Sequence, residues 1–303
     1  MTVKSQTLKV SGAKIYYELY GSGPVLLMIP GGPADAGVFT ALARVLADRY
    51  TCVPYDPRGN SRSVLDGPAT DLHLDRFGDD AAQLLAALGE EPMYVLGSSG
   101  GAQIGLNLAA RYSGRVRTLV AHEPPCLELL PDAEEHRASG KELDAIYKAH
   151  GAQAAMQKFM EMAGLAPPSK DAPPPPPETQ AAFGRMMGNM DFFFGHGRKA
   201  IVDYVPDVAA LKKGATRIVV GVGETTKGQI ANRSAVALAE RLGTDPVVFP
   251  GDHGGYGSHP DAFAKRLDQA LTRDHRQERL RRRGSPFSST SPAAVFASAP
   301  DLV

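Results

Sequence analysis

The sequence predicts an α/β fold in which a mostly parallel central sheet is flanked by helices. Two observations support this prediction. Short apolar runs typical of buried strands alternate along the chain with segments of helical periodicity. One of these runs leads through residues 97–101, Gly-Ser-Ser-Gly-Gly, directly into a helical segment. The order strand, Gly-x-Ser-x-Gly, helix is that of a nucleophile elbow, a sharp turn that presents one serine hydroxyl at the sheet edge.

The individual strands and helices follow from local patterns. Residues 7–10 and 14–19 alternate apolar and polar side chains around a Ser-Gly-Ala turn, which predicts an N-terminal hairpin. Continuous apolar runs predict strands that are covered on both faces, as in parallel sheets. These runs lie at residues 25–29, 52–55, 93–96, 116–121, 217–222 and 246–249. Apolar side chains at helical spacing predict helices over residues 76–88, 102–110, 230–242 and from Pro260 onward.

The alternation of strands and helices is interrupted after residue 126. Helical periodicity over residues 141–150 and 152–163 is followed by the proline run 173–177, which neither a helix nor a central strand tolerates. We expect that run to form an exposed polyproline connector. The interruption predicts a cap of residues 127–207, inserted over the active edge of the sheet.

The rest of the chain divides into a core and a tail. Residues 1–126 and 208–272 carry the alternating strands and helices, and we assign them to one α/β-type core. Residues 273–303 begin with a basic run and continue with Ser, Ala and Pro, a composition that predicts a disordered tail. We expect the basic run to be solvated rather than to bind nucleic acid.

Composition limits the classes of function. The chain carries 33 Lys and Arg against 33 Asp and Glu, so its formal charge of zero gives no support for binding nucleic acid or an anionic membrane. No apolar run approaches the ~20 residues of a membrane span, and residues 1–6 lack the apolar core of a secretory signal. The two cysteines, Cys52 and Cys126, suggest neither a disulfide framework nor a metal cluster. These features favour a cytoplasmic protein.

Ser99, the central serine of the elbow, is the candidate nucleophile. A serine hydroxyl needs an adjacent base, and in folds with this elbow the chain order is serine, acid, histidine. His253 follows the last predicted strand in a glycine-rich loop that can carry its imidazole back over the elbow. His259 is the alternative base, but it directly precedes Pro260 and is interpreted as the start of the last helix.

Attack by Ser99 on a carbonyl creates an oxyanion, which needs two backbone N–H donors. Gly100 directly follows the nucleophile and supplies one donor. The other is expected from the loop after the strand 25–29, which reads Pro-Gly-Gly-Pro. We select Gly32 there, because Pro33 has no N–H and glycine allows the backbone to turn its donor inward.

Two glutamates are candidates for the acid that orients the histidine. Glu123 lies at the C-terminal end of the strand that follows the elbow helix, where sites of open α/β sheets gather. Glu224 lies just after the penultimate strand, the commonest location of the acid. In that loop Thr226 occupies the slot where many relatives carry aspartate. We favour Glu123 and keep Glu224 as the alternative.

Several further residues are candidates for the surroundings of the site. The Met- and Phe-rich part of the cap predicts a hydrophobic substrate pocket, because Met side chains adapt to irregular apolar surfaces. The residues selected for this pocket are Gly31, Met187, Met190 and Phe193, while Asp35 and His122 are open candidates. An Asp–Arg pair in the turn 56–63 is expected to tie loops together. The sequence shows no metal-ligand spacing and no dinucleotide fingerprint, so we expect no metal and no cofactor.

Together these motifs resemble the α/β-hydrolase superfamily. The resemblance covers about residues 8–271 and rests on Pro30-Gly31-Gly32, Asp56-Pro57-Arg58-Gly59, the Ser99 elbow and the His253 loop. More narrowly the chain is similar to the zearalenone lactonases, through Gly97-Ser98-Ser99-Gly100, Arg115-Val116-Arg117 leading into His122-Glu123-x-Pro125, and residues 250–265. This resemblance implies that Glu123 is the triad acid and that Gly32 and Gly100 are the oxyanion donors.

The chain also departs from these lactonases. They place a tryptophan of the cap against the substrate, whereas this chain has no tryptophan, and the proline run in its cap is unlike theirs. The resemblance therefore implies the lactone-cleaving chemistry more strongly than the macrolactone specificity.

The sequence thus predicts a serine hydrolase that cleaves a small hydrophobic ester or lactone, with a zearalenone-type macrolactone as one candidate. Two alternatives use the same scaffold. One is another serine hydrolase, such as a proline iminopeptidase-like enzyme, suggested by Gly31-Gly32-Pro33, or a carbon–carbon hydrolase. The other is a binding protein that keeps an idle triad.

Overall fold

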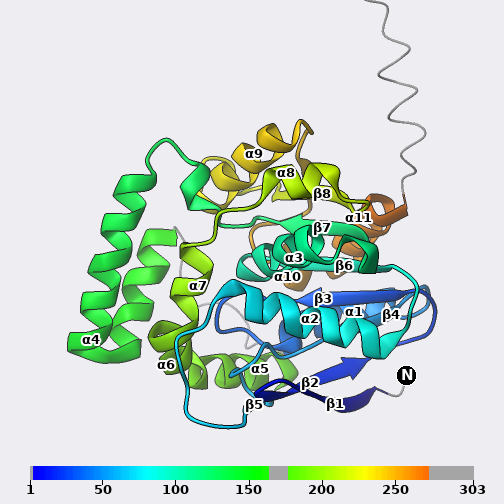
Figure 1. Ribbon diagram of the computed structural model, residues 1–303, viewed down its shortest axis with the longest axis horizontal. Coiled ribbons are helices and arrows are strands. Elements are labelled where there is room, and N and C mark those ends of the chain that lie inside the picture. Colours follow the sequence, from blue (N-terminus) through cyan, green and yellow to red (C-terminus); the bar gives the residue numbers. More distant parts are fainter. Residues whose placement is uncertain (1–2, 164–176, 273–303) are drawn as a thin grey trace, which may run out of the picture. The chain divides into compact units, whose positions relative to one another are not determined.

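The computed structural model describes residues 3–163 and 177–272, and its described residues up to Leu271 belong to one compact unit. Within these ranges six strands form a parallel sheet at the centre of the fold (Figure 1). Their order in the sheet is β4 (Thr51–Pro54), β3 (Val25–Ile29), β6 (Met93–Ser98), β7 (Val116–His122), β8 (Arg217–Gly223) and β9 (Val247–Phe249). The predicted mostly parallel sheet is confirmed.

The register of this sheet brings the carboxyl ends of neighbouring strands to one edge. Ile29 of β3 pairs with Gly97 of β6, and Ser98 of β6 pairs with His122 of β7. His122 in turn pairs with Gly221 of β8. The segments that follow these four strands therefore start side by side, at the edge where open α/β sheets form their sites.

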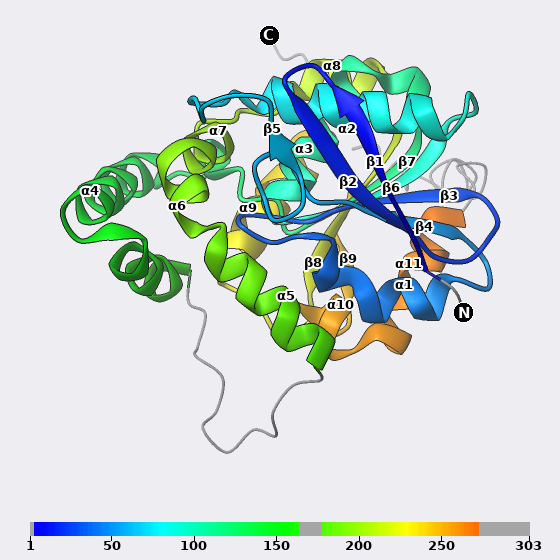
Figure 2. The same cartoon turned by 90° about the horizontal axis from the view of Figure 1, so that it is seen from below.

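Alternating side chains of the strands build two cores, one on each face of the sheet. Leu27 and Ile29 of β3 face one core, and Leu26 and Met28 face the other. The first core is closed by α2 (Leu74–Leu88), α3 (Gly100–Arg111), α8 (Val208–Lys213) and α9 (Ile230–Leu242). The second is closed by α1 (Thr40–Leu46) and α11 (Pro260–Thr272), and Figure 2 shows the two sets of helices on opposite sides of the strands. Cover on both faces explains why these strands are continuous apolar runs.

A second, antiparallel sheet contains the predicted N-terminal hairpin. Strands β1 (Lys4–Val10) and β2 (Ala13–Leu19) pair along their whole length, and β2 also pairs with β5 (Val64–Leu65). Isolated bridges join Tyr17 to Tyr55, which directly follows β4, and Tyr20 to Cys52 of β4. Strand β5 is absent from the sequence prediction, because two residues are too short to show an alternating pattern.

A helical insertion separates β7 from β8. It contains a short 3-10 turn, η3 (Leu127–Leu129), and then α4 (Ala133–Ala163), α5 (Pro177–Gly188), α6 (Met190–Phe192), the π-helical turn η4 (Phe193–Gly197) and α7 (Arg198–Val202). In Figures 1 and 2, α6 and α7 lie between α4 and the sheet. The prolines at 173–176 of the expected connector and the predicted tail 273–303 lie outside the described residues, and Pro177 begins α5.

Helix α4 differs in extent from the two helices predicted over 141–150 and 152–163. It begins at Ala133, well before the predicted start, because residues 133–140 (Ala-Glu-Glu-His-Arg-Ala-Ser-Gly) contain no large apolar side chain that could show helical spacing. The predicted break at residue 151 is present: Gly151 has φ 79° and ψ −178°, a conformation outside the helical region. The chain reverses there, so that α4 forms the pair of adjacent helices seen in Figure 1.

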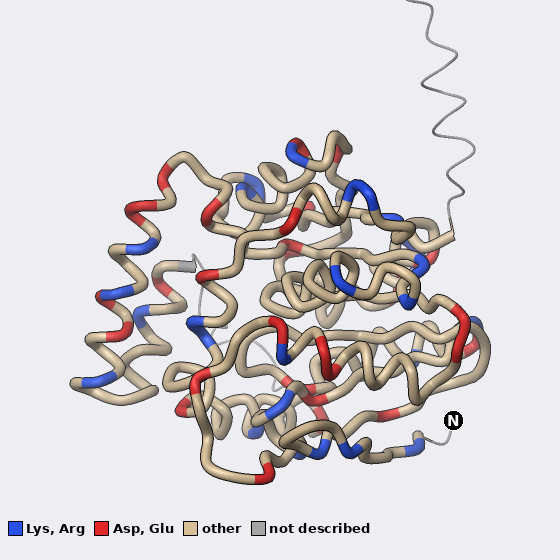
Figure 3. Tube along the Cα trace, in the orientation of Figure 1, with Lys and Arg blue, Asp and Glu red and all other residues tan. Residues whose placement is uncertain are grey.

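Charges of both signs are interspersed along the trace, as Figure 3 shows for the described residues. No helix in the ranges 3–163 and 177–272 combines the length and the apolar character that crossing a bilayer requires.

The turn after β6 needs glycine at two positions because backbone atoms approach it closely. A Cβ on Gly97 would lie 2.4 Å from the carbonyl oxygen of Gly101. A Cβ on Gly101 would lie 2.1 Å from the carbonyl oxygen of Ile29, in the neighbouring strand β3. Such distances are far below van der Waals contact, so a side chain at either position would displace the elbow from the sheet.

The substitution Gly101→Ala should lower the free energy of unfolding by about 2 kcal/mol, because the new methyl group meets backbone that has no room to move. Chemical denaturation monitored by circular dichroism measures this effect. Gly114→Ala is the matched control, since a Cβ on Gly114 meets nothing within 4 Å and should leave stability unchanged. Equal midpoints for the two variants would contradict this account of the elbow.

Candidate active site

Ser99 occupies the tip of the turn between β6 and α3. Its backbone has φ 56° and ψ −128°, a positive φ that is rare for a residue with a side chain and costs on the order of 1–3 kcal/mol. The surrounding hydrogen bonds hold it there: the N–H of Ser99 donates to the carbonyl of His122 at 2.9 Å, and its carbonyl accepts from Ala102 N at 2.9 Å. Strain of this kind, held at the start of a helix, is the geometry of a nucleophile elbow.

Glu123 and His253 form a hydrogen-bonded pair at the same edge of the sheet. Glu123 directly follows β7, with φ 48°, and its N–H donates to the carbonyl of Gly221 at 2.9 Å. His253 lies in the loop between β9 and α10 (Gly255–Ser258). Nδ1 of His253 is 2.6 Å from Oε2 of Glu123, whose side chain is fully buried, while the His253 side chain is 22 % exposed. The carboxylate therefore accepts a hydrogen bond from Nδ1–H and leaves the unprotonated Nε2 free to accept a proton.

The second oxygen of Glu123 is held by two further donors. The N–H of Gly223 donates to Oε1 at 2.9 Å, and the hydroxyl of Thr226 donates to the same oxygen. Asn232 in turn donates to Oγ1 of Thr226 at 3.1 Å. Burial alone would raise the pKa of Glu123, but the hydrogen bonds from His253, Thr226 and Gly223 lower its pKa to about 2. Glu123 is therefore an anion at neutral pH.

Thr226 is the polar contact that sequence reasoning missed. It lies in the loop after β8, where the alternative acid Glu224 was also expected, and its hydroxyl donates to Glu123, which follows a different strand, β7. Its side chain is fully buried. The signal in the sequence was the coincidence of a threonine at the usual acid position with a glutamate after β7.

The alternative acid and base lie elsewhere on the surface. Glu224 is exposed, and its N–H donates to the carbonyl of Phe249 at 2.9 Å. His259 is also exposed, with Nδ1 2.9 Å from the hydroxyl of Ser258. Among the contacts of the described residues, none joins either side chain to the Glu123–His253 pair.

The backbone nitrogens of Gly32 and Gly100 come together beside Ser99. A Cβ on Gly100 would lie 3.4 Å from the nitrogen of Gly32, and one on Gly31 would lie 2.6 Å from Cβ of Ser99 and 2.9 Å from the nitrogen of Gly100. Gly32 has φ +55°, which glycine adopts at no steric cost. In the described part of the chain, neither N–H donates to another group of the protein. Two such donors next to a serine are the requirements of an oxyanion hole.

A small pocket with mostly apolar walls lies against this loop. Phe193 and Ile201, both from the insertion, approach the two glycines: a Cβ on Gly32 would be 3.8 Å from the Phe193 ring, and one on Gly100 would be 2.7 Å from Cδ1 of Ile201. The full lining is Pro30, Gly32, Pro57, Asn60, Phe77, Ile104, Phe192, Phe193, Gly197 and Ile201.

The other pocket candidates are placed differently. Met187 is 39 % exposed and Met190 is buried in the core, and neither belongs to the pocket lining. Asp35 is fully buried and accepts a hydrogen bond from Arg185 Nε. His122 is also fully buried, with its ring centroid 5.6 Å from Phe249 and 5.4 Å from Phe263. Burial lowers its pKa to about 4, so His122 is neutral at pH 7.

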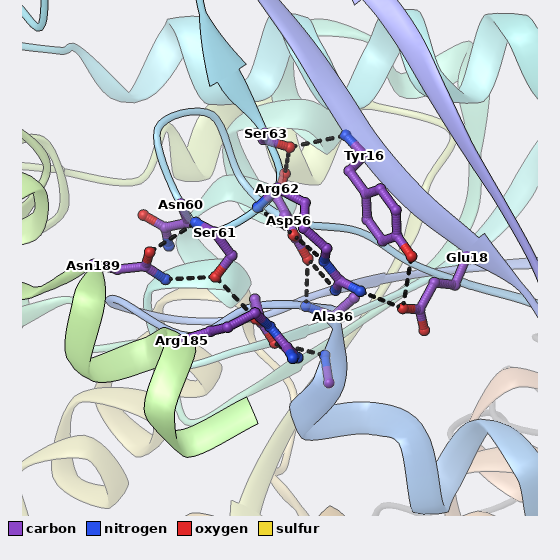
Figure 4. A network of polar contacts seen from close by, with 12 residues as sticks. Tyr16, Glu18, Ala36, Asp56, Asn60, Ser61, Arg62, Ser63, Arg185 and Asn189 are labelled. Atoms are coloured by element: carbon purple, nitrogen blue, oxygen red, sulfur yellow. Dashed lines mark hydrogen bonds and ion pairs between the residues drawn. The ribbon is translucent and has the colours of Figure 1, made fainter. Parts of the chain in front are cut away.

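The Asp–Arg pair expected in the turn 56–63 is present as Asp56–Arg62, with Nε 2.8 Å from Oδ2 (Figure 4). Asp56 also accepts from the N–H of Ala36 at 3.0 Å and so ties two loops together. Arg58 pairs separately with Asp80, at 2.7 Å. In the described ranges no group of three or more His, Cys, Asp or Glu side chains is arranged to hold a metal ion.

Comparisons with known proteins agree with this architecture. The sequence pattern of the alpha/beta hydrolase fold matches residues 24–143. The uncharacterized hydrolase YraK of Bacillus subtilis is 36 % identical over 278 residues, which cover 90 % of this chain and 98 % of that protein. Zearalenone hydrolase of Cladophialophora bantiana is 26 % identical over 272 residues, covering 87 % of this chain and 94 % of that protein.

The fold itself is shared with solved structures. The crystal structure of a hydrolase from Pseudomonas aeruginosa superposes with a TM-score of 0.69 at 22 % identity, over 89 % of this chain and 98 % of that one. The chain has a parallel sheet with a serine elbow and a helical insertion before β8. It is also similar to hydrolases over nearly its whole length. The chain belongs to the alpha/beta hydrolase family, and it is a hydrolase.

Proposed function

We propose that the protein is a serine-dependent hydrolase of carboxylic esters or lactones with a hydrophobic substrate. The observation that carries the proposal is the 2.6 Å hydrogen bond between buried, anionic Glu123 and Nδ1 of His253, at the sheet edge that also presents Ser99. A carboxylate in this position holds the imidazole in the tautomer whose Nε2 can act as a general base. It also stabilises the imidazolium that forms when Nε2 takes up a proton.

The reaction follows from these groups. Nε2 of His253 accepts the Ser99 hydroxyl proton while Oγ attacks the substrate carbonyl carbon, and the carbonyl oxygen becomes an oxyanion that accepts from the N–H groups of Gly32 and Gly100. Collapse of this intermediate breaks the ester C–O bond, and the imidazolium returns the proton to the leaving alkoxide. Water, deprotonated by His253, then hydrolyses the acyl-enzyme and regenerates the serine.

The substrate class follows from the pocket. Apolar walls from Phe77, Ile104, Phe193 and Ile201 favour a hydrophobic group next to the scissile carbonyl. The similarity to zearalenone hydrolase supports a macrolactone as one substrate to be tested, although this chain lacks a tryptophan. Apart from the substrate, the proposed steps use only residues of the chain and water.

The direct test is Ser99→Ala with p-nitrophenyl acetate, short-chain esters and macrolactones as substrates. We expect steady turnover by the wild type and a loss of at least about 10⁴-fold in kcat for the variant, because the oxyanion donors alone rescue little of the rate. A binding protein would show no sustained turnover in either form. Unchanged hydrolysis by the Ser99→Ala variant would refute the proposed mechanism.

Glu123→Gln and Glu224→Gln compare the two candidate acids. Glutamine at 123 offers an amide N–H to Nδ1 and favours the wrong tautomer of His253, so kcat should fall about 10³- to 10⁴-fold. Exposed Glu224 should tolerate the change within about twofold. Steady-state kinetics on a common ester measures both, and a collapse of kcat in the Glu224→Gln variant alone would move the acid to that loop.

Phe193→Leu tests the pocket. A smaller side chain against Gly32 should raise the ratio of kcat/KM for p-nitrophenyl hexanoate over acetate several-fold, since each accommodated methylene contributes about 1 kcal/mol. Phe194→Leu is the matched control: its ring is equally buried, 5.2 Å from that of Phe193, but does not line the pocket. The same ratio in both variants would show that Phe193 does not set acyl-chain preference.

A further inference from the structure

The loop that carries Gly32 is held through its carbonyl groups. The carbonyl of Gly31 accepts from the N–H of Ala34 at 3.1 Å. Nδ2 of Asn60 donates to the carbonyls of Gly32, at 3.2 Å, and Ala34, at 2.9 Å. Four successive residues therefore leave a single carbonyl, that of Pro33, for which neither this turn nor Asn60 supplies a donor.

The donor for that last carbonyl comes from the insertion. Asn189, between α5 and α6, donates from Nδ2 to the carbonyl of Pro33 at 2.7 Å. Its side chain is 5 % exposed and fully hydrogen-bonded: Nδ2 also donates to the hydroxyl of Ser61 at 2.9 Å, and Oδ1 accepts from the N–H of Ser61 at 2.7 Å (Figure 4). The Asn189 side chain thus joins the insertion to the loop, and its three hydrogen bonds to Pro33 and Ser61 fix the orientation of its amide.

Its partner Ser61 is itself fixed from both sides. Ser61 has φ 48°, a conformation that costs energy for a residue with a side chain, and its hydroxyl donates to Oδ2 of Asp35 at 2.9 Å. Asp35 is fully buried and is paired with Arg185 of α5 at 2.5 Å. The insertion therefore grips the loop after Gly32 at two points, one at Pro33 and one at Asp35.

This arrangement bears directly on the direction of the Gly32 N–H. The carbonyl of Gly31 and the N–H of Gly32 belong to one trans peptide group, in which C=O and N–H point in opposite directions. The hydrogen bond from Ala34 N–H to the Gly31 carbonyl therefore sets the direction of the Gly32 N–H. The planes that follow, at Gly32 and Pro33, are fixed by Asn60 and Asn189. Rotation about Gly32, which glycine would otherwise permit, is opposed by both amides.

We propose that Asn189 is a positioning residue of the oxyanion hole, through which the insertion fixes the Gly32 donor. This inference rests on the proposed function. It makes the insertion part of transition-state stabilisation in addition to its place in the wall of the pocket. Asn189 touches no reacting atom, so its removal should weaken binding of the transition state more than binding of the substrate.

The test uses Asn189→Ala and Asn189→Asp in the full chain, with an ester assay and inhibition by phenylboronic acid. Oγ of Ser99 bonds to boron, and His253 accepts the serine proton. The resulting tetrahedral boronate anion accepts hydrogen bonds from the N–H groups of Gly32 and Gly100. We expect kcat to fall at least about tenfold, KM to change less than about threefold, and the inhibition constant to rise in parallel with the loss of kcat.

Asn107→Ala is the matched control for lost packing and hydrogen bonds. Asn107 is also 5 % exposed, and its Nδ2 donates to Asp75 at 2.7 Å, between α3 and α2. It should lower the melting temperature without changing kcat or boronate affinity. An Asn189 variant that is destabilised to the same degree as Asn107→Ala but keeps wild-type kcat and boronate affinity would overturn the inference.

A measurement on the wild type decides the question even if the Asn189 variants do not fold. Binding of phenylboronic acid should slow hydrogen exchange at the N–H of Ser61, whose acceptor is Asn189, together with the N–H groups of Gly32 and Gly100. Slowing confined to the two glycines would overturn the inference and leave the proposed function intact. Absence of ester hydrolysis by the wild type, or full activity of Ser99→Ala, would instead refute the proposed function and the role of Asn189 with it.

Discussion

A buried carboxylate that stays ionised is the constraint on which the rest of the site depends. Removing Glu123 from water penalises its charged form, and in an apolar core that penalty would protonate it. Three donors from two other segments prevent this. The N–H of Gly223, at the end of β8, and the hydroxyl of Thr226, just after it, come from one segment, and Nδ1 of His253 comes from the loop after β9. These donors reach Glu123 only when β7, β8 and the loop after β9 lie together at the sheet edge. The ionised state of Glu123 therefore requires that this edge is assembled.

The same edge explains the backbone strain of the site. Ser99 and Glu123 both have positive φ, and each directly follows a central strand. The N–H of each donates to the carbonyl of the next strand, Ser99 to His122 and Glu123 to Gly221, at 2.9 Å in both cases. Hydrogen bonding between neighbouring strands thus continues one residue beyond β6 and β7. These hydrogen bonds offset the energetic cost of the positive φ at Ser99 and Glu123. Ser99 and Glu123 start side by side because their strands, β6 and β7, are neighbours.

The core could be predicted from the sequence because its signals are local. Apolar runs give the parallel strands, and Gly97, Ser99 and Gly101 give the elbow through requirements of a single turn. Glu123 and His253 were accessible for a related reason, since chain order in this fold places both after strands that end at one edge. The Asp–Arg tie at residues 56–62 was expected from type and spacing alone, although Arg58 turned out to pair with Asp80 of α2.

What the sequence did not reveal depends on contacts between distant segments. Thr226 reaches Glu123 across 103 positions, and Asn189 reaches Pro33 across 156, and neither residue belongs to a motif. The lining of the pocket is also non-local: Met187 and Met190 share the composition that predicts it, but Phe193 at the start of η4 lines the pocket, whereas Met187 of α5 is exposed and Met190 is buried outside the lining. The sequence shows where apolar residues are concentrated, whereas the packing of the insertion decides which of them line the pocket.

The central claim is that Ser99, His253 and the two glycine N–H groups act on one carbonyl. A crystal structure of the protein after reaction with diethyl p-nitrophenyl phosphate tests it most directly. The account predicts phosphorus bonded to Oγ of Ser99, with the phosphoryl oxygen within hydrogen-bond distance of the nitrogens of both Gly32 and Gly100 and with His253 still bonded to Glu123. Phosphorylation of a different residue, or a phosphoryl oxygen turned away from both nitrogens, would contradict it.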